Sequence, residues 1–535
     1  MAWGGYKSRP AASFSMSNRL SKNHSLYHRF LAVSLLLSFY LHFAALGTIP
    51  GWYSDEGTLL EIARHLAEGK VQYLGLTQSF LLAGRMPLFP GLLAILIKIF
   101  GTNMIVLRAL AGLLSSIAVF LLGKLIWQMS RDAWWAFASM LAYLLVPQLA
   151  FYQRLGFSYH LGAVLLLGSA QALWFYLERK ESRWLYLAAL GIGLAVLSDI
   201  AGVFFIFPVL IAGALQRQWR ETIVALGIAV LPAGIYLAAL QWTIPQALQF
   251  DLAFILHRVS VPLGAQIIIL LANAATMGVI YAWWQVMWLG YLLIPCTRCT
   301  LFFGLFWGFP WLMMARSLAL SDLSFYYQIL TFPLIAAGIG GALRYGLPMA
   351  ESKIRTMMQR VLHSLLGNRL STRRISVWGT AAVLLLLLAP LFLQAYTSLS
   401  LSFLTLQRLE KTFFVPAADA QAAVHYINQQ ITPDDLVIAS PALAWAIKGR
   451  VTDFQLCRAF IHQPTPHFPA NIPPERFAYD LQYTHAKYAL IDPIWQAWGA
   501  KDLPTLRQIT NEIQTRWHLE YQAGTIAIYR NPEYR

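Results

Sequence analysis

The chain has 535 residues, of which 58% are hydrophobic and only 12% are charged, and this composition excludes an ordinary soluble enzyme, a disordered protein and a collagen-like fibre. Its net charge is +16, and the whole excess lies in residues 1–396, which carry 28 Lys and Arg against 12 Asp and Glu, whereas residues 397–535 carry 12 of each. Because the basic excess is confined to the apolar part, these residues are expected to set the orientation of the chain in a membrane. The same distribution argues against nucleic acid as a partner.

The N-terminal segment, residues 1–29, contains five basic residues and no acid, and the first acid of the chain is Asp55. It is followed by an apolar run over 30–49, and about 20 such residues suffice to cross a bilayer. A cleaved signal peptide would have a shorter apolar stretch and then a small-residue cleavage site, but an aromatic and acidic segment follows here. We expect an uncleaved membrane anchor whose preceding tail, 1–29, is cytoplasmic.

Ten further apolar runs predict membrane helices and bring the total to eleven. They lie at 103–128, 133–151, 158–177, 184–199, 200–215, 221–241, 264–294, 299–315, 326–344 and 376–396. If the N-terminus is cytoplasmic and successive helices cross the membrane in opposite directions, most basic residues of the connecting segments lie on the cytoplasmic side, as the positive-inside rule requires. The pattern therefore predicts a mainly α, polytopic protein of the cell (inner or plasma) membrane, with a membrane module at 30–396 and the C-terminal end outside.

Residues 397–535 have a different character, with Pro, Asp and Asn between short apolar segments. The pattern predicts a helix over 417–430 and strands over 436–439, 488–491 and 525–529, and hence a soluble α/β domain outside the membrane. We expect it to be a satellite of the catalytic part. Five of its aromatic and imidazole side chains are candidates for an acceptor surface, although core packing is the simpler interpretation: Trp445, His462, His467, Trp495 and Trp498.

Two adjacent acids, Asp55 and Glu56, stand in the first outer loop, 50–86, just beyond the first membrane helix. They are either solvated loop residues or partly desolvated carboxylates beside Trp52 and Tyr53, one of which acts as a general base toward a hydroxyl. Position alone leaves both interpretations open. No cofactor is certain from the sequence, and if a divalent cation is used, these two acids are the candidate ligands.

Isolated arginines also fall on the predicted outer face, against the positive-inside trend: Arg85, Arg154, Arg258 and Arg316, with Arg108 near the outer end of the second membrane helix. A guanidinium group pairs with phosphate oxygens through two parallel hydrogen bonds, so these residues are candidate phosphate ligands. Contact with lipid headgroups is the alternative. The CxxC spacing of Cys296 and Cys299 lacks a second ligand pair, so a short turn is favoured over a metal or redox site.

This arrangement resembles the GT-C glycosyltransferases, in particular the bacterial branch related to protein O-mannosyltransferases and aminoarabinose transferases. The likeness covers about residues 30–345 and rests on five stretches in order: Tyr53-Ser54-Asp55-Glu56-Gly57, the proline-rich segment 85–101 that begins Arg85-Met86-Pro87, Leu107-Arg108-Ala109-Leu110, the segment 147–154 that ends Tyr152-Gln153-Arg154, and the segment 326–333 that ends in Pro333.

The resemblance implies an enzyme that takes a sugar from a polyprenyl-phosphate carrier. It would transfer the sugar, with inversion, to a hydroxyl of a lipid, glycan or protein on the outer face. By matching position, Asp55 is the base, Glu56 supports it or binds the sugar or a metal, and Arg85 meets the donor phosphate. Because phosphate leaves well, no separate carboxylic acid is needed.

Two positions depart from the family pattern. Tyr159 stands where relatives often have an acid, and Asp199 stands where they often have Lys, so the sugar, the acceptor or the activity itself differs from theirs; Asp199 is expected to pair with an outer arginine. A transporter or lipid flippase and a non-catalytic GT-C-like scaffold are the alternative functions. A transporter would favour two similar halves, which the sequence lacks.

Overall fold

The computed structural model describes residues 13–78, 85–259, 262–280, 282–317, 325–349, 351–353, 356–357, 360, 414–463, 465, 468, 471–496 and 504–534. The predicted eleventh membrane run, 376–396, lies outside the described residues. Helical structure occupies most of each of the other ten runs, as their long apolar stretches predict. The helices are α1 (Ser13–Phe43), α5 (Met104–Ser130), α6 (Ala133–Leu145), α7 (Pro147–Tyr152), α8 (Tyr159–Arg179), α9 (Ser182–Ser198), η1 (Ile200–Phe205), α10 (Ile206–Gln216), α11 (Trp219–Thr243), α13 (Leu263–Ile280), α14 (Ala282–Leu293), α15 (Thr297–Phe303), η2 (Gly304–Gly308), α16 (Phe309–Ser317), η4 (Phe325–Thr331), α17 (Phe332–Gly341) and η5 (Ala342–Gly346).

Within the described part of the chain, five helical spans are long and apolar enough to cross a membrane, and four apolar helices are shorter. Two predicted boundaries differ from the structure. The first helix begins at Ser13, so part of the predicted tail 1–29 is helical. The predicted run 133–151 divides at Val146, whose extended backbone ends α6 before α7 begins at Pro147. A residue before proline is pushed out of the helical region, and proline has no N–H for the preceding turn.

Basic residues end three of the membrane helices. Arg131, Lys180 and Arg217 each follow the last residue of α5, α8 and α10 and adopt a left-handed backbone, with φ of 57°, 60° and 57°. A positive charge at a helix C-terminus interacts favourably with the helix dipole. The residues that predict the membrane orientation therefore also terminate the helices.

The C-terminal part forms a five-stranded sheet of order β6-β5-β7-β9-β8. Its strands are β5 (Leu436–Ile438), β6 (Arg450–Thr452), β7 (Tyr488–Ile491), β8 (His518–Ala523) and β9 (Ile526–Arg530), with helices α21 (Ala417–Gln430), α22 (Pro441–Ala444), α23 (Phe454–Phe460) and α25 (Pro504–Arg516). Strand β5 is parallel to both β6 and β7, whereas β9 is antiparallel to β7 and β8. Helix α21 and strands β5, β7 and β9 confirm the predicted elements. Trp445 and Trp495 are buried, as core packing requires.

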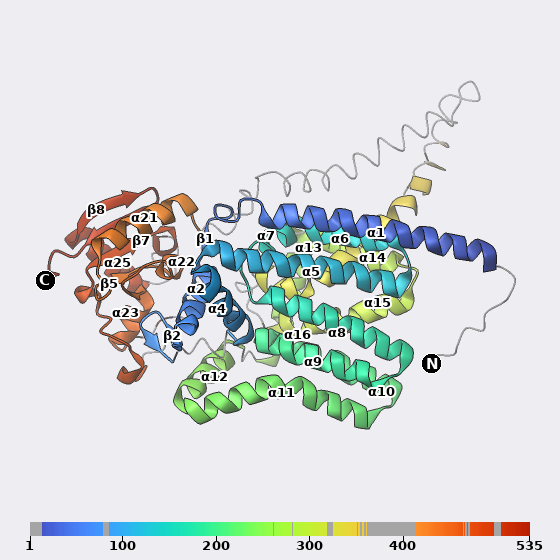
Figure 1. The fold of residues 1–535 in the computed structure, drawn as a ribbon, viewed down its shortest axis with the longest axis horizontal. Coiled ribbons are helices and arrows are strands. Elements are labelled where there is room, and N and C mark those ends of the chain that lie inside the picture. Colours follow the sequence, from blue (N-terminus) through green and yellow to red (C-terminus); the bar gives the residue numbers. More distant parts are fainter. Residues whose placement is uncertain are drawn as a thin grey trace, which may run out of the picture.

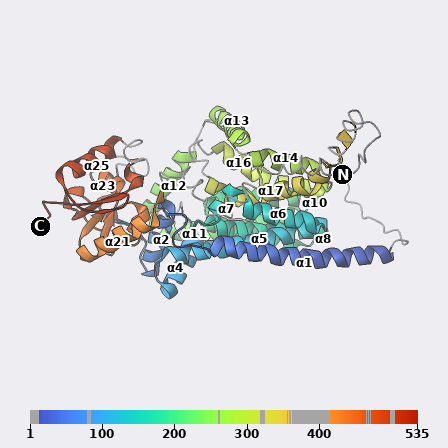
Figure 2. The same cartoon turned by 90° about the horizontal axis from the view of Figure 1, so that it is seen from above.

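This C-terminal domain lies at one end of the helical bundle, next to α2 (Ser54–Ala67) and α4 (Leu88–Phe100), while α1 runs along the bundle to the opposite end (Figure 1). The view from above places the domain at the same end (Figure 2). One hydrophobic core cluster includes Leu59 and Leu60 of α2, Phe89 of α4, Leu107 of α5 and the buried strands of the domain. The domain and the neighbouring ends of these helices therefore share one packed core.

Candidate active site

Helix α2 begins immediately after the short strand β1 (Trp52–Tyr53) and carries both predicted acids in its first turn. Tyr53 is extended, with φ −101° and ψ 143°, and the chain turns into the helix at Ser54. Acidic side chains in the first turn are stabilised by the positive end of the helix dipole. The following residues Leu59, Leu60, Ile62 and Ala63 are fully buried or nearly so, and their packing holds the helix in place.

Asp55 is paired with Arg85 across the first outer loop. The Nη2 group of Arg85 donates a hydrogen bond to Oδ1 of Asp55 at 2.9 Å. The side chains are 24% exposed for Asp55 and 17% for Arg85, so both are accessible to a small polar group while most of their surface is covered. The structure thus brings together the predicted base and the predicted phosphate ligand.

Glu56 is in a different environment, with no exposed side-chain surface. Arg108 of α5 donates to it from Nε at 2.9 Å and from Nη2 at 2.7 Å, and the backbone N–H of Gly156 donates to Oε1 at 2.8 Å. Arg108 also donates to the carbonyl oxygens of Leu46, Pro50 and Gly51, so all five guanidinium N–H groups have acceptors.

These contacts identify Glu56 as a residue that positions the start of α2. Both of its oxygens accept hydrogen bonds from buried protein groups, and its predicted direct role toward sugar or metal has no support in its contacts. Among the described residues, no three His, Cys, Asp or Glu side chains are grouped as metal ligands. Because Asp55 faces Arg85 and Glu56 faces Arg108, the two acids do not fit a shared cation site.

Arg154 is buried at the end of α1 and is 4% exposed. Its guanidinium donates to the carbonyl oxygens of Leu41 and Ala44, and to that of Ile49 at 3.1 Å. The last carbonyls of a helix have no partner within the helix, and Arg154 supplies one. These contacts support a capping role for Arg154 in place of the predicted phosphate contact. Arg258, in α12 (Pro245–Val259), and Arg316, in α16, have side chains outside the described part of the chain.

The two departures from the family pattern lie around the same site. Asp199 is buried, accepts a hydrogen bond from Ser158 Oγ at 3.2 Å, and interacts electrostatically with Arg85. Asp199 therefore lies within electrostatic reach of Arg85, which is less than the predicted pair. Tyr159 is 2% exposed and its ring lies 5.5 Å from that of Tyr327, centroid to centroid. An aromatic contact thus occupies the position where relatives often have an acid.

A buried polar network beneath the site was not predicted. His42 of α1 contacts Oε1 of Gln153 at 2.9 Å through Nε2, and Oγ of Ser38 at 3.1 Å through Nδ1, while Ser38 donates to Ser116 of α5 at 2.9 Å. Polar side chains that hydrogen-bond across helices hold membrane bundles together. In the sequence, this network is indicated only by the polar residues His42 and Gln153, which stand within or beside apolar runs.

The sequence favours a short turn without a metal or redox role at the CxxC pair, and the structure adds a covalent bond there. Cys296 and Cys299 form a disulfide at the start of α15. The remaining cysteine, Cys457, is buried in the C-terminal domain.

Neither a family model nor a curated protein matches the sequence. Solved structures do match the fold. ArnT from Cupriavidus metallidurans, bound to undecaprenyl phosphate, superposes with a TM-score of 0.59 at 16% identity, over 94% of this chain and 97% of that one, and its apo state gives the same values. The oligosaccharyltransferase of Archaeoglobus fulgidus in its apo form matches with a TM-score of 0.50 at 12% identity, over 87% of this chain and 69% of that one. The chain therefore shares the fold of these structures, and it has five helical spans long and apolar enough to cross a membrane among its described residues, in agreement with the predicted fold class.

Proposed function

We propose that this protein is a membrane glycosyltransferase that moves a sugar from a polyprenyl-phosphate donor to an acceptor hydroxyl on the outer face of the membrane. The acceptor is a lipid, a glycan or a protein, and the transfer inverts the anomeric carbon. The single observation that carries the proposal is the Asp55–Arg85 pair at the first turn of a buried helix in a GT-C fold. The undecaprenyl phosphate bound to ArnT supports the class of donor.

Arg85 is the donor-phosphate ligand. In the free protein its guanidinium is paired with one carboxylate oxygen of Asp55 and also interacts with Asp199. A phosphate diester or monoester offers several charged oxygens and a bidentate geometry that suits arginine. Donor binding therefore competes with Asp55 for Arg85, and the carboxylate of Asp55 becomes available when the donor is in place.

Transfer then takes place in one displacement. Asp55 accepts the proton of the acceptor hydroxyl, and the hydroxyl oxygen attacks the anomeric carbon of the sugar. The bond between that carbon and the phosphate oxygen breaks, and polyprenyl phosphate leaves with the electron pair. Arg85 stabilises the charge that develops on the leaving phosphate. The products are the glycosylated acceptor, the free lipid phosphate and a proton on Asp55 that passes to solvent.

Glu56 and Arg108 act through Asp55. Their buried two-point ion pair joins the first turn of α2 to α5, and the further bonds of Arg108 to the carbonyls of Leu46, Pro50 and Gly51 hold the chain that leads into this turn. A base must lie within about 3 Å of the proton that it abstracts. A rigid support immediately next to Asp55 meets that requirement.

The test is transfer by the purified protein in liposomes. The wild-type chain and the Asp55→Asn variant are supplied with a set of polyprenyl-phosphate sugars and with an extract of envelope lipids, glycans and proteins as the source of acceptor, and mass spectrometry measures release of the lipid phosphate. Envelope glycans from cells with and without the protein identify the acceptor. We expect release by the wild type and its loss in Asp55→Asn. Movement of the intact lipid-linked sugar across the bilayer without cleavage would instead identify a flippase.

A further inference from the structure

Two glycines on either side of the acidic pair are in contact with the C-terminal domain. A Cβ atom at Gly51 would lie 2.3 Å from the carbonyl oxygen of Val415, and one at Gly57 would lie 2.0 Å from that of Pro441 and 2.9 Å from Cα of Ala442. These distances are far below van der Waals contact, and the atoms met belong to the backbone, which cannot rotate away as a side chain does. Only glycine permits this approach at either position.

The residues between these glycines are also held by the domain. Strand β1 pairs antiparallel with β4 (Phe414–Val415), with Trp52 opposite Val415 and Tyr53 opposite Phe414. The rings of Trp52 and Trp445 lie 4.8 Å apart, centroid to centroid. Asp55 is therefore only two residues beyond a strand whose partner belongs to the C-terminal domain.

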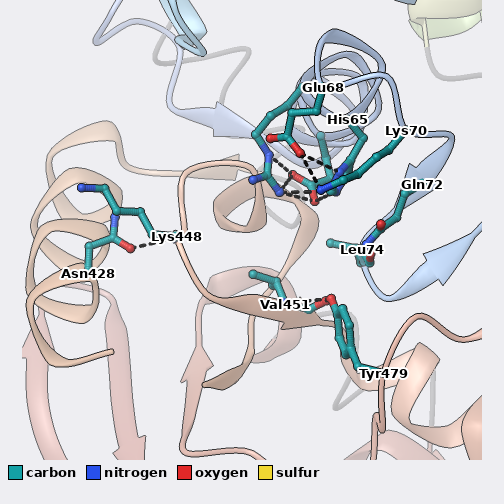
Figure 3. Close-up of polar contacts among 11 residues, drawn as sticks. His65, Glu68, Lys70, Gln72, Leu74, Asn428, Lys448, Val451 and Tyr479 are labelled. Atoms are coloured by element: carbon teal, nitrogen blue, oxygen red, sulfur yellow. Dashed lines mark hydrogen bonds and ion pairs between the residues drawn. The ribbon is translucent and has the colours of Figure 1, made fainter. Parts of the chain in front are cut away.

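The far end of α2 meets the domain as well. Glu61 binds Arg64 and His65 in a largely buried cluster, and the pKa of Glu61 is held below its ordinary value because these two partners outweigh the effect of burial. Figure 3 shows His65, Glu68 and Lys70 in one polar cluster on the loop side, and Tyr479 hydrogen-bonded to Val451 of β6 on the domain side. Tyr479 interacts electrostatically with both Glu61 and Arg64.

The hairpin that follows α2 continues this contact. Strands β2 (Gln72–Tyr73) and β3 (Leu76–Thr77) form the hairpin, and Leu76 makes an antiparallel bridge with Phe477. The backbone N–H of Ala478 donates to the carbonyl of Gly75 at 2.9 Å, and Arg476 donates to the carbonyl of Thr77 at 3.1 Å. The domain thus contacts the first outer loop at β1, which precedes α2, along α2 itself, and at the hairpin that follows α2.

From these contacts we propose that the C-terminal domain is a fixed clamp of the active site and that Gly57 is a positioning residue for Asp55. This inference rests on the proposed function. Helix α2 lies between two supports: the Glu56–Arg108 pair on the membrane side, and the backbone of Pro441 and Ala442, against Gly57, on the domain side. Because both supports act on the first two turns, the distance between Asp55 and Arg85 depends on both.

The contact at Gly57 provides the first test. The Gly57→Ala variant introduces a methyl group where no space exists, so α2 and the domain must move apart. A shift of about 1 Å in a catalytic group costs roughly 10²-fold in rate. We expect kcat for sugar transfer to fall about 10²-fold. The apparent affinity for polyprenyl phosphate should not fall, because Arg85 lies on another segment and a displaced Asp55 competes less for it. The matched control is Gly168→Ala in α8, where a Cβ meets nothing within 4 Å, and its kcat should equal that of wild type.

The second test does not depend on whether Gly57→Ala folds. Leu76 and Phe477 are bridge partners, and the spacing of antiparallel partners permits a disulfide, so Leu76→Cys with Phe477→Cys would lock the domain onto the loop. A fixed clamp predicts equal transfer rates in the oxidised and reduced forms, with the two single-cysteine variants as controls. Loss of transfer on oxidation that is reversed by reduction would show that the domain must open, and would overturn the proposal.

Failure of the two proposals can be told apart. If the wild-type chain transfers no sugar, the proposed function fails. If the wild-type chain is active and a folded Gly57→Ala protein has the same kcat, the proposed function stands and the clamp is wrong. A thermal unfolding midpoint measured on the same preparations identifies variants that are folded.

Discussion

Arg85 donates a hydrogen bond to Asp55 at 2.9 Å, although the two residues are on separate segments of the first outer loop. In the proposed reaction, this pair joins the group that receives a proton to the group that meets the leaving phosphate. The two halves of the reaction are therefore coupled through one contact, and the variants below separate them.

The Asp55→Asn variant should lose sugar transfer by about 10²–10⁴-fold, because the amide keeps the shape of the carboxylate but cannot act as the base. Expression should be unchanged, and affinity for polyprenyl phosphate should be equal or higher because Arg85 is no longer shared with a carboxylate. Equilibrium binding of labelled lipid phosphate and single-turnover transfer measure the two effects. Full transfer by the variant would remove the assignment of Asp55 as base.

The Arg85→Ala variant should weaken both donor binding and transfer, since the lost charge acts on the phosphate in the bound state and in the transition state. Arg85→Lys keeps the charge without the paired geometry and should fall between alanine and wild type. The same binding and transfer assays apply. A variant with normal donor affinity and normal kcat would show that the phosphate binds elsewhere.

The Arg108→Met variant should destabilise the protein by about 3–5 kcal/mol, because it leaves the buried Glu56 carboxylate without its partner. Replacing both residues, with Glu56→Gln and Arg108→Met, should recover much of that loss, since no charge is then left unpaired. Thermal unfolding in detergent micelles measures the difference. Arg183→Met is the matched control because its ion pair with Glu181 is exposed, and its midpoint should not change.

The buried carboxyl of Asp453 predicts that the stability of the C-terminal domain depends on pH. Burial raises the pKa of this carboxyl to about 7, well above its value in an unfolded chain. The folded state therefore binds the proton more tightly, and the stabilisation is fully present below about pH 4 and is lost as pH rises through about 7. The protection factors of the amides in residues 414–463, which correct for the intrinsic rise of the exchange rate with pH, should be lower at pH 8 than at pH 5.5. Asp453→Asn keeps the acceptor for the backbone N–H of Leu456 and should remove most of that difference; an unchanged slope would point to another group.

The orientation of the chain is predicted to be N-inside and C-outside, from the basic residues of the short connecting segments. A tag placed after Arg535 should react with an impermeant label in intact cells, and a tag before Met1 should react only after permeabilisation. Labelling in the opposite sense would invert the assignment of the outer loop.

Much of the fold is predictable from local pattern. Long apolar runs predict the membrane helices, and α21, β5, β7 and β9 follow from short-range periodicity and turn residues. Strands β6 and β8 were missed for a physical reason. Strand β6 has three residues and begins with an exposed Arg450, and β8 is an edge strand with little buried surface, so neither shows an alternating apolar pattern.

The site is predictable in part. The adjacent acids and Arg85 stand out because charged residues are rare in this chain, and their pairing agrees with the predicted roles. The different roles of Asp55 and Glu56 cannot be inferred from neighbouring sequence positions, since they depend on Arg108, 52 residues away, and on the backbone of Gly156. The contacts of Gly57 with the domain depend on a still longer separation, and no local pattern indicates them.

The pairing of β1 with β4 has a consequence for how the protein is made. Trp52 emerges early in synthesis, whereas its partner Val415 comes after nearly all the membrane helices. The segment with Asp55 and Glu56 therefore lacks this support until the C-terminal domain has been synthesised, and closing so long a loop is slow and carries an entropic cost. If the proposed function holds, a chain that ends before this domain retains Arg85 but lacks the support of Asp55, and it should transfer sugar poorly even where it still binds the carrier lipid.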